Sequence, residues 1–375
     1  MNLYRKSIRR TTLFVDSYYK KNLLIRKLNQ CAARGELRII ENLKGSSEAI
    51  TVLIEKDKQI FVRKMINTEK ALPLKRQAAW LLDFKQNTYV VNLISENLEL
   101  NRYSIDLEYN ADSVSLFEFL HSNSFETCKI ILEKIWDFMF QEVYSIDGLR
   151  YLENERDENI NHLLKNRVSL AASQHPLISQ LLECEYITIQ GKLLYGFDQV
   201  LRKIQGNTEA WNNLAYFRTS ARIHGDLTVD NILVDGDLIQ PVIIDPSDDN
   251  KLSGPVIDIA RHLQSLAGGY EFLNQMMTSP VISIDSTGRF GEISYVDLRS
   301  NRYDEIYRWT MNSLESRLLE VELQSLTFHV GLLFGRMLPH RVRINANTAP
   351  VYLAKSLEFL NLYLAQITKN NEIMI

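Results

Sequence analysis

The sequence predicts an α+β chain with a small β-rich N-lobe and a larger, mostly helical C-lobe. Short runs rich in β-branched and aromatic residues occupy 37–109, whereas from Ser113 onward apolar residues mostly recur at helical spacing. The chain has 375 residues, 45% of them hydrophobic, and exceeds the size at which one core usually stops growing. We therefore divide it into an extension of residues 1–35, an N-lobe of 36–110 and a C-lobe of 111–375.

The first 35 residues are markedly basic and predict an amphipathic helix, because lysines and arginines alternate there with Phe14, Tyr18 and several leucines. A solvated helix that packs on the N-lobe explains this pattern better than a membrane-surface or RNA role, since an isolated basic helix is a weak motif. The net charge of -3 gives no general indication of a nucleic-acid partner.

The N-lobe is expected to contain five strands and one main helix. The predicted strands are 37–43, 49–54, 60–66, 88–94 and 102–109. A polar connection of hairpin type joins the second strand to the third, and the helix near 72–84 lies between the third strand and the fourth.

The C-lobe reads mostly as helices. Helical spacing is clearest over 125–144 and 154–172, and the polar turn Gln190-Gly191 then suggests a small hairpin. The chain's three cysteines lie far apart and have neither metal-site spacing nor an even disulfide count. No apolar stretch approaches the length of a membrane span. We therefore expect a cytoplasmic protein without stable membrane insertion.

The most informative segment joins one aspartate and one asparagine on a loop. His224-Gly225-Asp226 is followed five residues later by Asn231, and the second of two apolar strands ends at Asp245. Phosphoryl transfer needs a carboxylate to accept the proton of the attacking hydroxyl, and oxygen ligands to hold magnesium against nucleotide phosphates. An ordinary turn with capping residues is the alternative, but turn chemistry requires neither this spacing nor the two strands.

In this combination the segment resembles the aminoglycoside phosphotransferase and choline kinase superfamily, relatives of protein kinases whose catalytic loop reads His-Gly-Asp followed by an Asn. The resemblance implies a protein-kinase-like two-lobe fold with ATP and Mg²⁺ as cofactors. It places the catalytic loop at 222–234 and the metal-binding loop at 243–250. The stretch 263–271, together with His329 and the stretch 336–341, is similar to a bacterial branch linked with sugar and cell-surface polysaccharide pathways.

The same resemblance implies a role for each residue of the motif. Asp226 would be the catalytic base, and His224 would brace the loop. Asn231 and Asp245 would be magnesium ligands. Asp258, on the helix after the metal-binding loop, would bond to the backbone of the catalytic loop and support it; a helix-surface aspartate is the alternative.

The resemblance also implies a lysine on the third strand that holds the nucleotide phosphates. Lys64 stands at that point, and Arg63 points to the opposite face of the strand. A solvated lysine is the alternative. A loop containing Gly45, Ser46 and Ser47 would cover the phosphates with backbone amides and hydroxyls.

Residues 104–110 would be the hinge that meets the adenine, with Glu108 and Asn110 among the nucleotide-binding residues. One position departs from the pattern. Gln77 stands on the N-lobe helix where a glutamate would pair with Lys64, and an amide brings no charge to that pair.

These features favour an ATP-dependent kinase of a small hydroxyl compound, with a sugar or sugar derivative as the preferred class. Thr228 replaces the lysine usual in protein kinases. A neutral to anionic acceptor suits the basic residues of the later helices, although scattered solvated charge also explains them. These residues are Arg289, Arg299, Arg336, His340, Arg341 and Arg343. An inactive nucleotide-binding scaffold and a protein kinase or nucleotidyltransferase relative are the alternatives.

Overall fold

The computed structural model describes residues 24–26, 28–43, 49–99, 101–235, 238–247 and 254–373, with side chains up to residue 368. The chain forms two compact units. Unit 1 comprises residues 1–114 and 233–249, and unit 2 comprises residues 115–232 and 250–375. The segment 233–249, which carries Asp245, therefore belongs to unit 1, although unit 2 precedes and follows it in the sequence.

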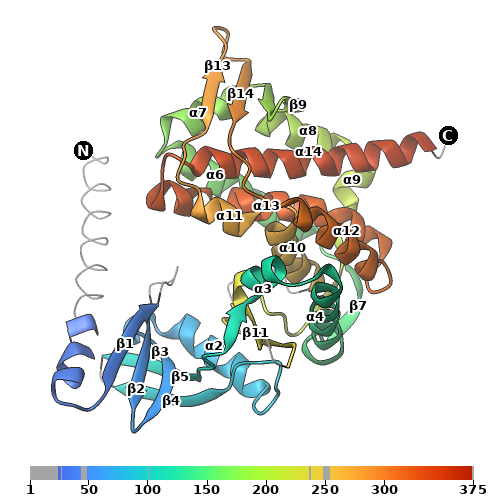
Figure 1. The fold of residues 1–375 in the computed structure, drawn as a ribbon. Coiled ribbons are helices and arrows are strands. Elements are labelled where there is room, and N and C mark those ends of the chain that lie inside the picture. Colours follow the sequence, from blue (N-terminus) through green and yellow to red (C-terminus); the bar gives the residue numbers. More distant parts are fainter. Residues whose placement is uncertain are drawn as a thin grey trace. The chain divides into compact units, whose positions relative to one another are not determined.

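Unit 1 is built on a five-stranded antiparallel sheet with strand order β1-β2-β3-β5-β4 (Figure 1). Its strands are β1 (Arg38–Leu43), β2 (Ile50–Lys56), β3 (Gln59–Asn67), β4 (Leu93–Glu99) and β5 (Arg102–Glu108). Asp57 and Lys58 make the turn between β2 and β3 with φ of 52° and 66°, as a two-residue hairpin requires. Helix α2 (Leu72–Asp83) buries Leu74, Ala78 and Leu81 at helical spacing.

The predicted strand 88–94 is wrong in position, because β4 begins only at Leu93. The apolar residues before β4 bond to a different part of unit 1. Val90 forms a parallel bridge with Ile243, whose amide donates to Tyr89 O at 2.8 Å. Their apolar character therefore reflects burial beside the segment that precedes Asp245.

The N-terminal extension packs on the sheet where it is described. Residues 24–26 and 28–33 are helical, and Leu24 and Leu28 are buried in a core cluster with strand residues such as Val52 and Ile54. The predicted packing on the N-lobe is confirmed for this part. Phe14, Tyr18 and the other residues up to 23 lie outside the described residues.

A second, three-stranded sheet has the order β12-β11-β6. Its strands are β6 (Ser113–Ser115), β11 (Ile232–Asp235) and β12 (Gln240–Ile243). Ile232 and Val234 are buried in β11, and Pro241 and Ile243 in β12, so each strand alternates between a buried and a more exposed face. Asp245 follows two residues after the end of β12.

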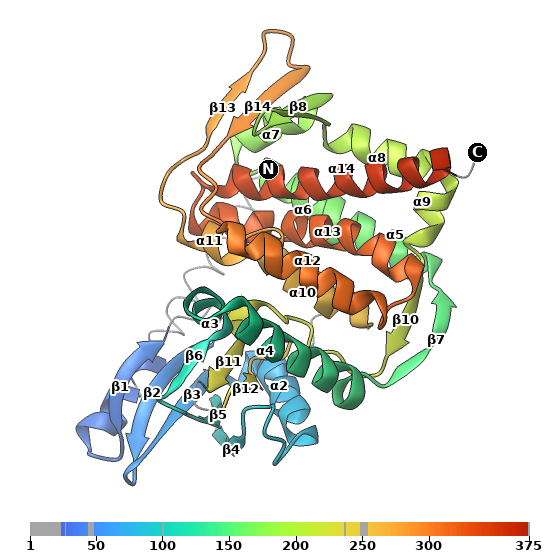
Figure 2. The same ribbon diagram turned by 45° about the vertical axis from the view of Figure 1, so that its right-hand side comes forward.

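Unit 2 is mostly helical, as predicted. Its α-helices are α3 (Leu116–Ser122), α4 (Phe125–Phe138), α5 (Glu153–Glu158), α6 (Asn166–Ala172), α7 (Pro176–Glu183), α8 (Phe197–Gly206), α9 (Thr208–Asn213), α10 (Pro255–Leu266), α11 (Tyr270–Gln275), α12 (Asn301–Glu315), α13 (Glu320–Ile344) and α14 (Ala349–Ile373). Turns of π-helix continue α4 over Met139–Val143 and join α5 to α6 over Asn159–Lys165. The long helices α13 and α14 lie side by side (Figure 2). No helix among the residues described here combines the length and the apolar character needed to cross a bilayer.

The predicted hairpin at Gln190-Gly191 is present between β8 (Tyr186–Ile189) and β9 (Lys192–Tyr195). Sequence patterns missed four other strands of unit 2. They are β7 (Ile146–Tyr151), β10 (Tyr216–Ser220), β13 (Val281–Ile284) and β14 (Phe290–Ser294). Strand β10 leads into the segment with His224, and α10, whose residues are all buried, follows Asp245 in the chain.

Candidate active site

The loop between β10 and β11 carries the His-Gly-Asp motif, and glycine is required at its centre. Gly225 has a φ of 82°, in the left-handed region that side-chain-bearing residues rarely adopt. The loop ends in a short 3₁₀ turn over Val229–Asn231 and continues directly into β11. The backbone turn at Gly225 thus separates buried His224 from Asp226, whose side chain is 40% exposed.

A buried carboxylate holds this loop from α10. Asp258 accepts the backbone N–H groups of His224 at 2.7 Å and Gly225 at 2.5 Å, and the hydroxyl of Tyr144 at 3.2 Å. Burial raises the pKa of Asp258, while these donors and the nearby His224 lower it. His224 Nδ1 in turn accepts the N–H of Asp226 at 3.2 Å. The loop backbone is therefore fixed on both sides of Gly225.

Asn231 fixes the carboxylate of Asp226. Its amide nitrogen donates to Asp226 O at 2.7 Å and to Asp226 Oδ2 at 3.1 Å. The guanidinium of Arg261, on α10, brings its Nε to 3.5 Å from Asp226 Oδ1. Because the nitrogen of Asn231 is used on Asp226, its oxygen is the atom left to coordinate a cation.

The second half of the loop is anchored by two residues that sequence reasoning missed. Val229 N–H donates to Ser265 Oγ at 3.2 Å, and Ser265 donates onward to Glu271 Oε1 at 2.7 Å. Burial raises the pKa of Glu271 to about 8. A signal for such residues was present, since α10 carries Ser265 among other polar residues, Asp258 and Arg261 included, within a helix that is buried throughout.

The predicted site residues of unit 1 form a second group. Lys64 Nζ donates to Asp245 Oδ1, and the lysine side chain is mostly buried. Asp245 has a φ of 59°, a left-handed conformation that aspartate tolerates better than most residues and that is common at functional turns. On the opposite face of β3, Arg63 binds Asp106 with two hydrogen bonds of 2.6 and 2.7 Å. The two basic neighbours on β3 thus have different partners.

Gln77 bonds to the same segment as Lys64. Its side-chain amide donates to the backbone oxygen of Pro246 at 3.2 Å, one residue after Asp245. Gln77 was expected to stand where a glutamate would pair with Lys64, whereas this bond is made to backbone. Gln77 therefore holds the loop that contains Asp245.

For the other residues predicted to bind nucleotide, the structure gives little evidence about nucleotide binding. Gly45, Ser46 and Ser47 lie outside the described residues. Glu108 ends β5, and its side chain is exposed. Asn110 donates to Asp235 Oδ2 at 3.0 Å and accepts Asp112 N–H at 2.9 Å, so its side chain stabilises the turn after β5.

The predicted ligands suit magnesium in chemical type, since Asn231 offers an amide oxygen and Asp245 a carboxylate. Within the described part of the chain, no group of three or more His, Cys, Asp or Glu residues could hold a metal ion by itself. A magnesium ion at these residues would therefore need further oxygen ligands, such as nucleotide phosphates or water.

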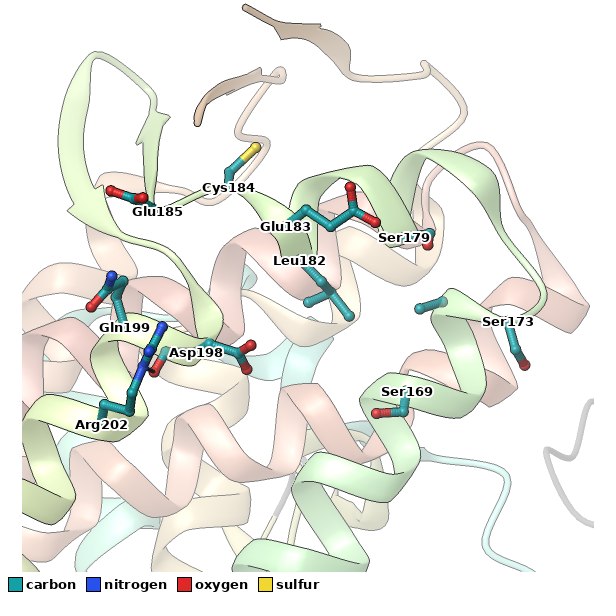
Figure 3. A pocket seen from close by; sticks show the side chains of 11 residues that line it. Ser169, Ser173, Ser179, Leu182, Glu183, Cys184, Glu185, Asp198, Gln199 and Arg202 are labelled. Atoms are coloured by element: carbon teal, nitrogen blue, oxygen red, sulfur yellow. Dashed lines mark hydrogen bonds between the residues drawn. The ribbon is translucent and has the colours of Figure 1, made fainter. Parts of the chain in front are cut away.

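A pocket of unit 2 involves none of these residues. It has a volume of about 440 Å³ and is lined from α6, α7 and α8 (Figure 3). Glu183, Glu185 and Asp198 give it acidic walls, and Arg202 is the basic residue among its lining side chains. No residue of the His-Gly-Asp loop lines it.

No protein-family model matches the chain, and no curated protein matches it. Solved structures do match. A thermostable mutant of the aminoglycoside phosphotransferase APH(4)-Ia, in complex with AMP-PNP and hygromycin B, has a TM-score of 0.50 and 10% identity over 88% of this chain and 96% of its own. A protein from Haemophilus somnus 129PT, described as a fructosamine-3-kinase, has a TM-score of 0.48 and 13% identity over 85% and 90%. The match at 0.50 shows that this chain has a protein-kinase-like fold, as its motif implied.

Proposed function

We propose that this chain is a cytoplasmic ATP-dependent kinase that transfers the γ-phosphoryl group to a hydroxyl of a small molecule, with a sugar or sugar derivative as the favoured class. The observation that carries the proposal is the hydrogen bonding of Asn231 to Asp226, on a loop bound by buried Asp258. This arrangement leaves a half-exposed carboxylate in a fixed position, as a general base requires.

Asp226 would accept the proton of the acceptor hydroxyl. As that proton leaves, the hydroxyl oxygen forms a bond to the γ-phosphorus, the bond from the γ-phosphorus to the bridging oxygen breaks, and ADP departs with the electron pair. Asn231 holds Oδ2 of the carboxylate, and Arg261 lies near Oδ1. Fixing the base in this way lowers the entropic cost of reaching a reactive geometry.

On the nucleotide side, Lys64 would exchange its bond to Asp245 for bonds to phosphate oxygens. Asn231 and Asp245 would hold magnesium through their oxygen atoms, and magnesium, when bound, neutralises phosphate charge. The proposed step needs both groups of residues to act on one ATP. The two groups are connected along the chain, because strands β11 and β12 lie between Asn231 and Asp245 in the sequence.

Two further observations favour a small acceptor. Thr228 stands where protein kinases usually carry a lysine, so it offers no cationic side chain there. It is buried, and its N–H donates to Asp226 O at 2.8 Å. The fold neighbour APH(4)-Ia binds AMP-PNP together with hygromycin B. We extend the use of a nucleotide and a small hydroxyl acceptor to this chain as part of the proposal.

A nucleotide-binding scaffold without turnover is the second candidate. Gln77 favours it, because its hydrogen bond to Pro246 leaves Lys64 without the charged helix partner expected of an active kinase. The intact set of Asp226, Asn231 and Asp245 opposes it.

The two candidates differ in ADP formation. We would screen sugars, sugar derivatives and amino alcohols with magnesium and ATP, and compare wild type with Asp226→Asn and with Asp230→Asn, which changes an exposed carboxylate nearby. Asp226→Asn should lower turnover about a hundred- to ten-thousand-fold, because the amide cannot accept a proton. Its ATP affinity and the turnover of Asp230→Asn should stay near wild type. Equal turnover of Asp226→Asn and wild type would rule out Asp226 as the base, and ATP binding without any ADP formation would favour the scaffold.

A further inference from the structure

Unit 2 contains a group of two arginines and two tyrosines, and of these four residues the proposed mechanism uses only Arg261, which lies near the carboxylate of Asp226. We call this group the arginine–tyrosine cluster. It consists of Arg261 on α10, Tyr270 on α11, Arg341 on α13 and Tyr352 on α14.

Arg261 is the member next to Asp226. It is 8% exposed, and its Nε lies 3.5 Å from Asp226 Oδ1. Another guanidinium nitrogen donates to Gln264 Oε1 at 3.2 Å. Within the described residues, Nε has no hydrogen-bond partner. The nearby carboxylate is thus too distant to satisfy this buried N–H.

Arg341 is held in a fixed orientation by aromatic side chains. Its guanidinium lies 5.2 Å from the ring centroid of Tyr270 and 4.8 Å from that of Tyr352, and it donates to the Tyr270 hydroxyl at 2.8 Å. The Tyr352 hydroxyl is bound to Asn274 at 2.8 Å. The described residues offer Arg341 no carboxylate partner, and its Nε is buried without a hydrogen bond.

Electrostatic interactions connect the cluster to Asp226. Burial raises the pKa of Tyr270, Arg341 and Arg261 lower it, and Asp226 raises it. Tyr270 is therefore close enough to both arginines and to the proposed base to sense their charges. Contacts connect the two arginines as well, because Gln264, which accepts from Arg261, donates to Met337 Sδ at 3.3 Å, and Met337 lies one helical turn before Arg341 on α13.

The cluster has more positive than negative charge. Two guanidinium groups, which stay protonated in proteins, accompany the carboxylate of Asp226. Glu271 also lies near the cluster, but burial raises its pKa to about 8, so it is mostly neutral at pH 7. A buried N–H of a cation is costly unless it has a hydrogen-bonding partner; Nε of each arginine is buried without one, although Arg341 as a whole is half-buried. The planar guanidinium of an arginine can donate two parallel hydrogen bonds to one oxyanion.

We propose that the acceptor carries an anionic group, a phosphate or a carboxylate, which binds Arg341 and Arg261 while Asp226 receives the proton of its hydroxyl. This inference rests on the proposed kinase function. It narrows the acceptor from neutral or anionic compounds to anionic ones, and it excludes polycations, which the two guanidinium groups would repel.

The first experiment compares acceptors that differ only in charge. Hexoses, their 6-phosphates and the corresponding uronic acids would be assayed for ADP formation with wild type, Arg341→Gln and the matched control Arg343→Gln, an exposed arginine two residues further along α13. An anionic member should exceed its neutral counterpart at least about tenfold in kcat/KM, since a charge-assisted hydrogen bond contributes about 1.5 to 3 kcal/mol. Arg341→Gln should raise KM for anionic acceptors with kcat little changed, and Arg343→Gln should not. Equal use of neutral compounds, or a preference that survives Arg341→Gln, would overturn the inference.

A second experiment does not depend on turnover. Inorganic phosphate, added at constant ionic strength to protein saturated with ADP, should raise the thermal unfolding temperature of wild type and Arg343→Gln more than that of Arg341→Gln. Should Arg341→Gln fail to fold, Arg341→Lys replaces it, with a weaker phosphate effect expected because the two parallel hydrogen bonds are lost. Equal stabilisation of all variants would show that the cluster is no anion site. Arg341-dependent stabilisation together with no ADP formation from any acceptor would retain the anion site and contradict the kinase function.

Discussion

The side-chain amide of Gln77 donates a hydrogen bond to the backbone oxygen of Pro246, 3.2 Å away. The residue before Pro246 is Asp245, which accepts a hydrogen bond from Lys64. Helix α2 and strand β3 therefore both bind the segment that follows β12. An amide is the right group at position 77 for this purpose, because a backbone oxygen needs a donor and a carboxylate has none.

Gln77→Glu should therefore weaken the protein and its nucleotide binding. The substitution removes the donor to Pro246 and places a negative charge beside a carbonyl oxygen, which should lower the free energy of unfolding by about 1 kcal/mol or more. Gln77→Ala is the control, because it removes the same bond without adding charge. Thermal unfolding and titration with an ATP analogue would measure both effects. Tighter nucleotide binding by Gln77→Glu than by wild type would mean that residue 77 pairs with Lys64 once nucleotide is bound.

Adjacent residues of β3 should have separable effects. Lys64→Met should reduce ATP affinity about tenfold or more, because it removes a charged donor to phosphate, and should change stability little, since the Asp245 side chain is 37% exposed. Arg63→Met should instead destabilise the protein by about 3 kcal/mol or more, because it leaves the carboxylate of Asp106 buried without its bidentate partner.

Urea unfolding and nucleotide titration of both variants would check this contrast. We expect Arg63→Met to bind ATP normally at temperatures where it is folded. If Arg63→Met loses ATP affinity and Lys64→Met keeps it, the assignment of the two faces of β3 must be reversed.

The sequence predicted most elements of unit 1 because their periodicity and turns are local properties. The turn Asp57-Lys58 and the spacing of Leu74, Ala78 and Leu81 are examples. The strand predicted at 88–94 failed because Val90 is apolar for a tertiary reason, its bridge to Ile243. The alternation of apolar and polar residues along the chain cannot show which distant segment packs against an apolar run.

For the candidate site, sequence spacing indicated the loop with Asp226 and Asn231 and the segment with Asp245, but not the contacts that support them. Asp258 was identified because the motif continues along α10. Glu271 was not, because its importance arises from burial and from Ser265, which it meets across the junction of two helices. The bond of Gln77 to Pro246 was also missed. A side chain that bonds to the backbone of a loop far away in the sequence leaves no pattern in that sequence.

Asp258→Asn should impair catalysis more than nucleotide binding. The amide retains one acceptor oxygen but turns an N–H₂ group towards donors, so the bonds to His224 and Gly225 cannot both survive. We expect turnover to fall at least about tenfold, which corresponds to about 1.4 kcal/mol, with ATP affinity near wild type. Tyr144→Phe removes only the third donor and should have a smaller effect. Equal activity of Asp258→Asn and wild type would show that these bonds do not position Asp226.

Glu271 should make stability fall as pH rises through the neutral range. Burial, with smaller contributions from Asp230 and Asp226, raises its pKa to about 8 in the folded protein, whereas the ordinary value is 4.5. Between these values the folded protein holds a proton that the unfolded chain has released. The stabilising effect of the neutral carboxyl is therefore complete below about pH 4.5 and is lost as pH rises towards 8, by up to about 1.4 kcal/mol for each pH unit.

Glu271→Gln tests this dependence directly. The amide is neutral at every pH and still offers an oxygen to Ser265, so the anchor from Val229 through Ser265 should persist. Urea unfolding at pH 5, 6, 7 and 8 should show similar stability of wild type and variant at pH 5 and a growing advantage of the variant towards pH 8. Glu315→Gln, on the exposed end of α12, is the control and should follow wild type throughout. If the difference between wild type and Glu271→Gln stays constant from pH 5 to pH 8, Glu271 does not hold its proton in the folded protein, and the contact with Ser265 is made by a carboxylate.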